Sequence, residues 1–389
     1  MALATAQEAA EVYREVAAHN PDAFLTSLSV SLNNLAGAYR ASGQLQAALS
    51  TAREAAGLRR ALIGRNREAF QPWLAMTLTN LAEIESTMGF HTEALASAQE
   101  AVDLYRELVV PYRDAYLANF ATSLATLSNA QVAAGQIEAA LASAQEAAEL
   151  RGELVLRNRK AFLPDLANSL NNLANIQKSI GRLQAAIEMA QKAVDLRREL
   201  VASNRAAFLP DLGSSLHNLA SMQAGVGRNE DALVTAEESV RLHRELAASN
   251  RVAFLSGLGG SLTNLANRQA ALGQRENALH TSQESMTIYR ELVTRNPGAY
   301  AQEFARTSGS FADALTKLDR AAEAVPVLAE AIRTILPSVK RAPPAYLDIC
   351  INLLRAYIST AEIARAQHDN LLVEELVGVI KPYLRRKEN

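Results

Sequence analysis

The sequence of 389 residues is poor in cysteine, aromatic residues, glycine and proline. Its single cysteine, Cys350, excludes an intramolecular disulfide framework and favours a reducing compartment. Aromatic residues make up 5% of the chain, and there are only 18 glycines and 11 prolines, whereas Ala, Leu, Glu, Gln and Arg are abundant. This composition is typical of an almost wholly helical protein.

The sequence also lacks an excess of charge of either sign and any long apolar run. Its 39 basic and 41 acidic residues are spread along the chain and leave a net charge of −2, so no basic field attracts nucleic acid or anionic lipid. No apolar run approaches the ~20 residues that a membrane span needs. The N-terminus, MALATAQEAAEVYREV, does not resemble a signal peptide. We therefore expect no nucleic-acid or membrane partner and a cytoplasmic location.

What the sequence does contain is a repeat of 46 residues, visible in three columns. The first column is asparagine, with Tyr112 in one place: Asn20, Asn66, Asn158, Asn204, Asn250 and Asn296. The second is glycine: Gly43, Gly89, Gly135, Gly181, Gly227 and Gly273. The third is aromatic: Phe24, Phe70, Tyr116, Phe162, Phe208, Phe254, Tyr300 and Tyr346. A spacing without insertions over most of the chain indicates an array of equivalent structural repeats.

Each repeat is predicted to form two helices. We expect the first, helix A, to begin near the proline in segments such as FLPDL (Pro72, Pro164 and Pro210) and to end at the column glycine in a left-handed conformation. Helix B has apolar residues at three- and four-residue spacing. We expect it to end at the column asparagine, acting as a left-handed cap. A helix A column of Glu85, Gln131, Gln177, Gln223 and Gln269 must be hydrogen-bonded if it is buried.

The segment SLNNLAGAYRASGQLQAALSTAREAAGL resembles the tetratricopeptide repeat. Its large, small, aromatic and turn positions are Leu32, Leu35, Ala36, Tyr39, Gly43, Ala48, Ala52 and Ala55, and the fourth repeat has Leu170, Leu173, Ala174, Gln177, Gly181, Ala186, Ala190 and Ala193. The resemblance implies an all-α, right-handed α-solenoid of helix-turn-helix repeats. Because the usual repeat has about 34 residues, the longer repeat is most similar to the kinesin light chain type. Similar arrays join STAND-class signalling NTPases or CHAT proteases, where they would act as sensors.

The repeat register predicts three regions. Residues 1–19 correspond to helix B alone, residues 20–319 form the regular array, and residues 320–389 form a degenerate last repeat with C-terminal capping helices and a charged tail. A solenoid usually needs a polar capping helix at its end. We therefore expect the chain to be a fragment of a longer protein, or its first helix to be covered by another element. That helix could also mediate self-association.

No residues suggest catalysis, a metal site or a cofactor. The six histidines are scattered without metal-ligand spacing, and phosphate loops and nucleophile motifs are absent. Cys350 lies in an apolar segment and is expected to be a buried, inert thiol. Trp73 is expected to pack against the preceding repeat, with a ligand-binding aromatic as the alternative. The sequence therefore does not predict an enzyme.

A binding groove is predicted instead. In tetratricopeptide superhelices, the helix A positions of Val30, Asn33, Asn34, Gly37, Arg40 and Ala41 line the concave face, and the resemblance implies the same here. In the first six repeats these 36 positions contain only three charged residues, Arg40, Glu83 and Lys178. The candidate peptide-binding residues are Asn34, Asn80, Asn129, Asn172, Asn175, Asn218, Asn264, Asn267, Arg40 and Lys178.

Two interpretations of the asparagines remain open. Each amide offers a donor and an acceptor, which suits the backbone of an extended peptide, and the resemblance to the kinesin light chain type implies peptide contact. Alternatively, each amide bonds to a neighbouring helix A and stiffens the solenoid. Arg40 and Lys178 are too far apart along the array to form the carboxylate clamp of co-chaperone repeats. We therefore predict a module that binds a protein or peptide segment of low charge, as sensor or scaffold of a signalling protein; the alternative is a structural spacer or oligomerisation scaffold.

Overall fold

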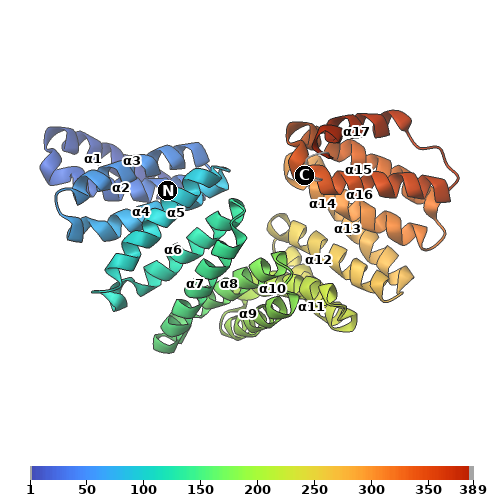
Figure 1. The fold of residues 1–389 in the computed structure, drawn as a ribbon, viewed down its shortest axis with the longest axis horizontal. Helices are drawn as coiled ribbons and strands as arrows, with labels where there is room; N and C mark the ends of the chain where they lie inside the picture. Colours follow the sequence, from blue (N-terminus) through green and yellow to red (C-terminus); the bar gives the residue numbers. More distant parts are fainter. Residues whose placement is uncertain (1, 385–389) are drawn as a thin grey trace. The chain divides into compact units, whose positions relative to one another are not determined.

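The computed structural model describes residues 2–384, which form α-helices joined by short turns (Figure 1). The helices are α1 (Ala2–His19), α2 (Pro21–Ala41), α3 (Leu45–Ile63), α4 (Arg67–Thr87), α5 (His91–Leu108), α6 (Arg113–Ala133), α7 (Ile137–Arg157), α8 (Arg159–Ser179), α9 (Leu183–Ser203), α10 (Arg205–Gly225), α11 (Asn229–Ser249), α12 (Arg251–Ala271), α13 (Arg275–Arg295), α14 (Pro297–Thr316), α15 (Ala321–Arg341), α16 (Pro343–Ile363) and α17 (Asn370–Leu384). Even-numbered helices are the A helices of the repeats, and odd-numbered helices are the B helices. No strand occurs in residues 2–384, which confirms the all-α solenoid of helix-turn-helix repeats.

The turn from helix A to helix B has one conformation throughout. The six column glycines have φ between 74° and 81°, in the left-handed region that glycine adopts at little cost. The same turn occurs at Asp319 (φ 60°) and Arg365 (φ 51°), which continue the 46-residue spacing without glycine. The hairpin geometry therefore extends to α16 and α17, and the expected charged tail, residues 385–389, lies outside the described residues.

The column asparagines have a different role from the one expected. They are extended rather than left-handed, with φ from −141° to −153°, and each is the N-cap of helix A. Each Oδ1 accepts a hydrogen bond from the backbone N–H three residues later, at 3.1–3.3 Å. Helix A therefore begins just after the asparagine, and Pro72, Pro164 and Pro210 lie inside it rather than at its start. The expected left-handed asparagine cap was wrong because helices B and A meet at a single residue at five of the six asparagines, and at Asn66 three residues separate them.

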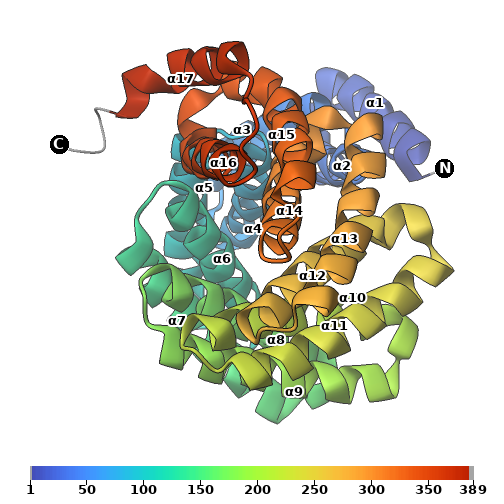
Figure 2. The same cartoon turned by 90° about the vertical axis from the view of Figure 1, so that its right-hand side faces the viewer.

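The chain forms two compact units, one up to Leu196 (unit 1) and one from Arg197 (unit 2). Consecutive helices pack against one another from α1 to α8 in unit 1 and from α10 to α17 in unit 2 (Figure 2). Small residues such as Ala48, Ala52 and Ala98 are fully buried, which lets neighbouring helices approach closely. In unit 2 the core runs from Ala220 to Ile380 and is rich in Leu, Ile and Val. None of the helices in the described part of the chain is both long and apolar enough to cross a bilayer.

Consecutive B helices are joined by a ladder of exposed ion pairs, in which an arginine meets a glutamate 40 residues later. The six pairs have N–O distances of 2.5–3.0 Å: Arg14–Glu54, Arg60–Glu100, Arg106–Glu146, Arg198–Glu238, Arg244–Glu284 and Arg290–Glu330. A second ladder joins an arginine at the start of helix A to a glutamate in the last turns of the helix B that follows it. Its pairs are Arg67–Glu107, Arg113–Glu153, Arg205–Glu245 and Arg251–Glu291. Both ladders therefore pair opposite charges at repeated positions on the B helices.

A buried polar column on the B helices ties each repeat to the next helix A. Arg59, Arg151 and Arg197 donate from Nη1 to the backbone carbonyl oxygen 14 residues later, at 2.6, 3.2 and 3.0 Å. Tyr105, His243 and Tyr289 occupy the same column. At His243 the imidazole lies where a Cβ on Gly213 or Gly257 would stand, 2.8 Å from ring atoms, so both neighbouring A helices need glycine there. These side chains are structural cross-links, and the sequence reasoning did not identify them.

Candidate functional site

All ten predicted binding residues lie on A helices. In unit 1, α2 carries Asn34 and Arg40, α4 carries Asn80, α6 carries Asn129, and α8 carries Asn172, Asn175 and Lys178. In unit 2, α10 carries Asn218, and α12 carries Asn264 and Asn267. Asn34, Asn129 and Asn175 are exposed, Asn264 is buried, and the other asparagines are half-buried. The predicted set is therefore divided between the A-helix faces of the two units.

Two of the predicted amides bond to the preceding helix A. Asn80 donates from Nδ2 to Asn33 Oδ1 at 3.3 Å, and Asn264 donates from Nδ2 to the backbone oxygen of His217 at 3.0 Å. Both bonds join residues 47 apart, so they are the same cross-link in different repeats. These contacts correspond to the solenoid-stiffening interpretation of the asparagine ladder. Asn129 and Asn175, which belong to the other asparagine column, have exposed side chains.

The charges in the predicted lining of unit 1 are partly neutralised. Arg40 donates to Glu83 Oε2 across neighbouring A helices, with an N–O distance of 2.7 Å. Two of the three charged groove residues of the first six repeats therefore pair with each other. Trp73, on the same helix as Glu83, contacts the preceding repeat through the Arg59 guanidinium, 5.6 Å from its ring centroid, and remains 46% exposed.

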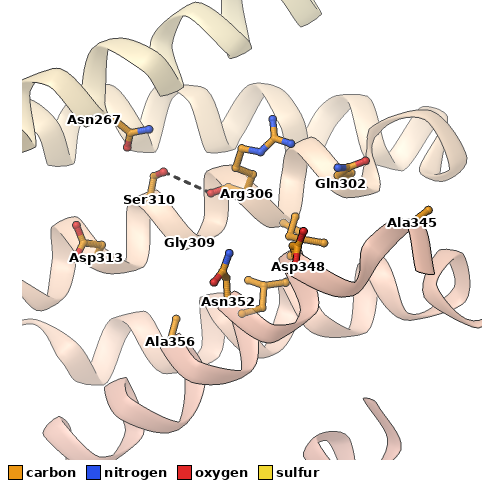
Figure 3. Close-up of a pocket in the computed structure, with 13 residues that line it drawn as sticks. Asn267, Gln302, Arg306, Gly309, Ser310, Asp313, Ala345, Asp348, Asn352 and Ala356 are labelled. Atoms are coloured by element: carbon orange, nitrogen blue, oxygen red, sulfur yellow. Dashed lines mark hydrogen bonds between the residues drawn. The ribbon is translucent and has the colours of Figure 1, made fainter. Parts of the chain in front are cut away.

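Unit 2 contains two adjoining cavities on its A-helix face. The larger, of about 560 Å³, is lined by α12, α14 and α16, with residues Asn267, Gln302, Ala305, Arg306, Gly309, Ser310, Asp313, Ala345, Asp348, Ile349, Asn352, Leu353 and Ala356 (Figure 3). The smaller, of about 320 Å³, is lined by His217, Ser221, Gly260, Thr263, Asn264, Asn267, Arg268, Tyr289, Glu303, Arg306 and Thr307. Asn267 and Arg306 line both, so the two cavities form one continuous groove across α10–α16.

The larger cavity opens because the repeat changes at this point. Ser310 occupies the column position of Asn264, and its Oγ bonds to the backbone oxygen of Arg306 in its own helix at 3.4 Å (Figure 3). A serine there does not reach the preceding helix A as Asn264 does. Gly309 and Ala356 also hold small side chains at groove positions. The amide cross-link seen at Asn264 is therefore missing at the larger cavity.

Charge is concentrated in the same region. The six groove positions of the seventh repeat include Arg306, Asp313 and Lys317, three charged residues, as many as the 36 positions of the first six repeats together. Arg268 adds a charge in a column that otherwise holds Ala, Ile, Met and Thr. The sequence reasoning missed these residues because it counted only the first six repeats and the standard lining positions. Their departure from the repeat columns is the signal that could have revealed them.

Other chemistry is sparse in the described part of the chain. Residues 2–384 contain no cluster of three or more His, Cys, Asp or Glu side chains able to hold a metal ion. Cys350 is fully buried, and burial raises the pKa of its thiol to about 11, which keeps it protonated and unreactive at neutral pH. This agrees with the inert thiol expected from the sequence.

Comparison with known proteins identifies the repeat. The family model described as tetratricopeptide repeat matches three segments, residues 28–67, 74–111 and 166–204. These three segments are tetratricopeptide repeats. Tetratricopeptide-repeat proteins are generally non-catalytic scaffolds for protein–protein interaction. No curated protein matches the sequence.

Solved structures share the fold of this chain at low sequence identity. BtubC (BKLC) from P. vanneervenii is 20% identical, with 63% of this chain and 91% of that chain covered and a TM-score of 0.51. The apo form of RapI is 14% identical, with 79% and 98% covered and a TM-score of 0.54. Aspartyl phosphate phosphatase F from Bacillus subtilis is 13% identical, with 84% and 75% covered and a TM-score of 0.55. At these identities the similarity shows the fold alone.

Proposed function

We propose that this tetratricopeptide-repeat array binds an extended segment of a partner protein along the A-helix face. The observation that supports this most directly is the continuous groove of unit 2, where two cavities of about 560 and 320 Å³ share Asn267 and Arg306. Asn267 and Asn352 project into the larger cavity from α12 and α16 (Figure 3). Their amides can donate to and accept from the peptide groups of an extended chain.

In unit 1 the same role is proposed for the exposed asparagines of the ladder. Asn34, Asn129 and Asn175 have exposed side chains on α2, α6 and α8. Amides repeated at the spacing of the A helices, about 8–10 Å, would contact peptide groups about three residues apart along one partner segment. Asn80 and Asn264 contribute indirectly, since their bonds to the preceding helix A fix the groove wall.

At the level of the cell, we propose that the array is the sensor or scaffold part of a larger cytoplasmic signalling protein. The resemblance to arrays attached to STAND and CHAT proteins supports this assignment, and the single cysteine fits a reducing compartment. The register of the sequence supports a half repeat at 1–19, a regular array at 20–319 and a capping region at 320–389.

A structural spacer or oligomerisation scaffold is the second candidate. The bonds from Asn80 and Asn264 to neighbouring A helices support it, because hydrogen bonds between A helices would stiffen the array. Self-association would involve α1, where Val12 is 53% exposed. If the array self-associates in this way, light scattering will report a concentration-dependent mass that falls when Val12 is replaced by Glu.

The groove can be tested by site-specific photo-crosslinking of the full chain. A photoreactive amino acid at Ser310 should crosslink a partner protein in cells, whereas the same group at Val234, which is 65% exposed on α11, should not. Replacing Asn267 and Asn352 with Ala should abolish the crosslink without shifting the thermal melting curve. Equal crosslinking from Ser310 and Val234, or a crosslink that survives the double substitution, would show that the groove is not the binding site.

A further inference from the structure

We infer that the smaller cavity of unit 2 binds one carboxylate of the partner segment through the guanidinium of Arg268. The inference rests on the proposed groove binding and adds the chemistry of one position of the ligand. The carboxylate can belong to an Asp or Glu side chain or to the C-terminus of the partner. Arg268 lines this cavity from α12 but not the larger one.

Arg268 departs from the residues found at its position in the other repeats. Equivalent positions hold Ala38, Ile84, Ala130, Ile176, Met222, Ala314 and Thr360. All of these except Ala38 are buried, so the arginine side chain starts between packed helices rather than on the open face. Small, apolar or hydroxyl side chains satisfy the packing there. A charged residue at this position is therefore not required by the fold.

The guanidinium of Arg268 lacks a partner in the unbound chain. Its Nε is buried, and no acceptor for it exists among residues 2–384. Such an N–H group is costly to leave unpaired. Burial also lowers the pKa of Arg268, because no neighbouring anion compensates for the lost hydration. A carboxylate fits this vacancy well, since Nε and one Nη of an arginine can donate to its two oxygens.

The cavity beside Arg268 is open because Gly260 has no side chain. Other repeats have Val30, Met76, Thr122, Asn168, Ser214, Arg306 and Asn352 at this lining position. A Cβ on Gly260 would lie 3.4 Å from Tyr289 Oη, so glycine fits closely beside the tyrosine of α13. The cavity of about 320 Å³ is far larger than the ~30 Å³ of one liquid water. A carboxylate group can therefore enter it.

The remaining polar groups of the wall do not select an anion by themselves. Asn264 Nδ2 already donates to the backbone oxygen of His217 at 3.0 Å. Glu303 and Arg306, both on α14, contribute one charge of each sign. Glu303 forms no ion pair with Arg268 in the described part of the chain. Selection of a carboxylate therefore depends on Arg268.

The test uses the full chain and two phage-displayed libraries of random ten-residue peptides. In one library the peptides end in a free C-terminus, and in the other the C-terminus is joined to the coat protein. Peptides that bind the parent chain but not the double variant Asn267→Ala and Asn352→Ala are specific for the groove. A side-chain carboxylate predicts Asp or Glu at one fixed position of these peptides. A terminal carboxylate predicts binders from the free library only.

The selected peptide is then synthesised for fluorescence anisotropy. Replacing its acidic residue with the corresponding amide, or amidating its C-terminus, should weaken binding to the parent chain on the order of tenfold. This comparison identifies which carboxylate occupies the cavity.

The array supplies a matched variant of the arginine. Arg268→Met introduces the residue found at the equivalent position 222, and it should bind the acidic and neutral peptides equally. Because the change removes a buried, unpaired N–H group, the thermal melting midpoint of the unbound chain should rise by about 2–4 °C. Arg241→Gln, at an exposed position on α11, and Glu303→Gln, on the cavity wall, should keep the tenfold difference.

Three results would overturn the inference. If groove-specific peptides show no preference for a carboxylate, groove binding stands and the anion site fails. If Arg268→Met keeps the preference, or melts at a lower temperature than the parent chain, the arginine is a structural residue. If no groove-specific peptide emerges, the inference is wrong, and the crosslinking from Ser310 then decides separately whether the groove binds a protein.

Discussion

At the scale of single residues, Glu85 is a buried carboxylate whose stability depends on its hydrogen-bond partners. Its carboxylate is 3% exposed and accepts hydrogen bonds from Arg53 Nη2 at 3.0 Å and from Ser97 Oγ at 2.8 Å. Removing Arg53 would leave a buried charge with one neutral partner. We predict that Arg53→Ala lowers the free energy of unfolding by about 1–2 kcal/mol, less than a fully buried pair because Arg53 is half exposed.

The later repeats supply the control for this prediction. Glutamine replaces Glu85 at 131, 177, 223 and 269, and the Arg53 position then holds Gln99, Gln145, Gln191 and Glu237. In the double variant Arg53→Ala and Glu85→Gln, no buried charge remains, so urea unfolding should show most of the loss restored. A double variant as unstable as Arg53→Ala alone would mean that the arginine acts through packing.

The glutamines of this column differ from what the sequence predicts. They are buried, as expected, but the Oε1 atoms of Gln131, Gln177, Gln223 and Gln269 accept no hydrogen bond from any described residue. The side chain that donates to Glu85 is Arg53, on helix B of the preceding repeat. Arg53 is the only arginine in its column, so the four glutamines lack the equivalent donor. Hydrogen bonding of the column could not be predicted from position alone, because the donor belongs to a different helix.

His243 makes the stability of the array depend on pH. Burial lowers the pKa of its imidazole, which donates from Nδ1 to the backbone carbonyl oxygen of Ser239 at 2.9 Å and lies 2.9 Å from Ser261 Oγ. The unfolded chain therefore binds a proton at higher pH than the folded chain does, near pH 6.5. The stabilisation by neutral His243 is present above that pH, and it is lost progressively as the pH falls below it.

Unfolding measured between pH 5 and 8 checks this. We expect the denaturation midpoint to fall on acidification in the parent chain, and the slope to become shallower in His243→Asn, which does not titrate. His91→Asn, at the start of α5, is the comparison for removal of a histidine as such. An unchanged slope in His243→Asn would assign the pH dependence to other groups.

At the scale of helices, one rung of the arginine–glutamate ladder is missing. The repeat places Gly152 where arginine is expected and Lys192 where its glutamate is expected. Gly152 lies inside α7, and a Cβ there would meet nothing within 4 Å. Restoring the pair with Gly152→Arg and Lys192→Glu should raise stability by about 1–1.5 kcal/mol, mostly from replacing a glycine inside a helix.

A double-mutant cycle separates the two contributions. Gly152→Arg alone should give the glycine term of about 0.5–1 kcal/mol, and the coupling with Lys192→Glu should be about 0.5 kcal/mol, as for exposed ion pairs. Thermal unfolding of the four proteins is sufficient. A coupling near zero would show that the ion pairs of the ladder do not contribute to the free energy of unfolding.

The helices also show what the sequence could and could not predict. The glycine columns predicted the turns, because only a left-handed residue fits there and the φ values agree. The asparagine column predicted the right boundary but the wrong function, since Asn158 is both the residue after α7 and the N-cap of α8. The groove was predicted only in part, because Arg268 and Asp313 depart from the pattern on which the prediction was based.

At the scale of the whole molecule, the described helices within each unit contact near neighbours in sequence. Stability in such arrays is close to a sum of repeat and interface terms, so a local defect should remain local. In Arg53→Ala, amide hydrogen exchange should increase in α2–α5 and stay unchanged in α12–α16. A uniform increase across all helices would show that the chain unfolds as one cooperative body.

The fixed offset of the arginine–glutamate ladder has a consequence for how such a chain can change length. Each rung joins a residue to one 40 positions later, whereas the period is 46, so every rung crosses from one repeat to the next. Duplicating or deleting a whole repeat would therefore leave each arginine facing a glutamate. The exception is the junction of Gly152 and Lys192, where an exchange would bring Gly152 against a glutamate or Lys192 against an arginine. A change in repeat number would therefore keep the ladder paired on either side of that rung and leave an unpaired or like-charged contact across it.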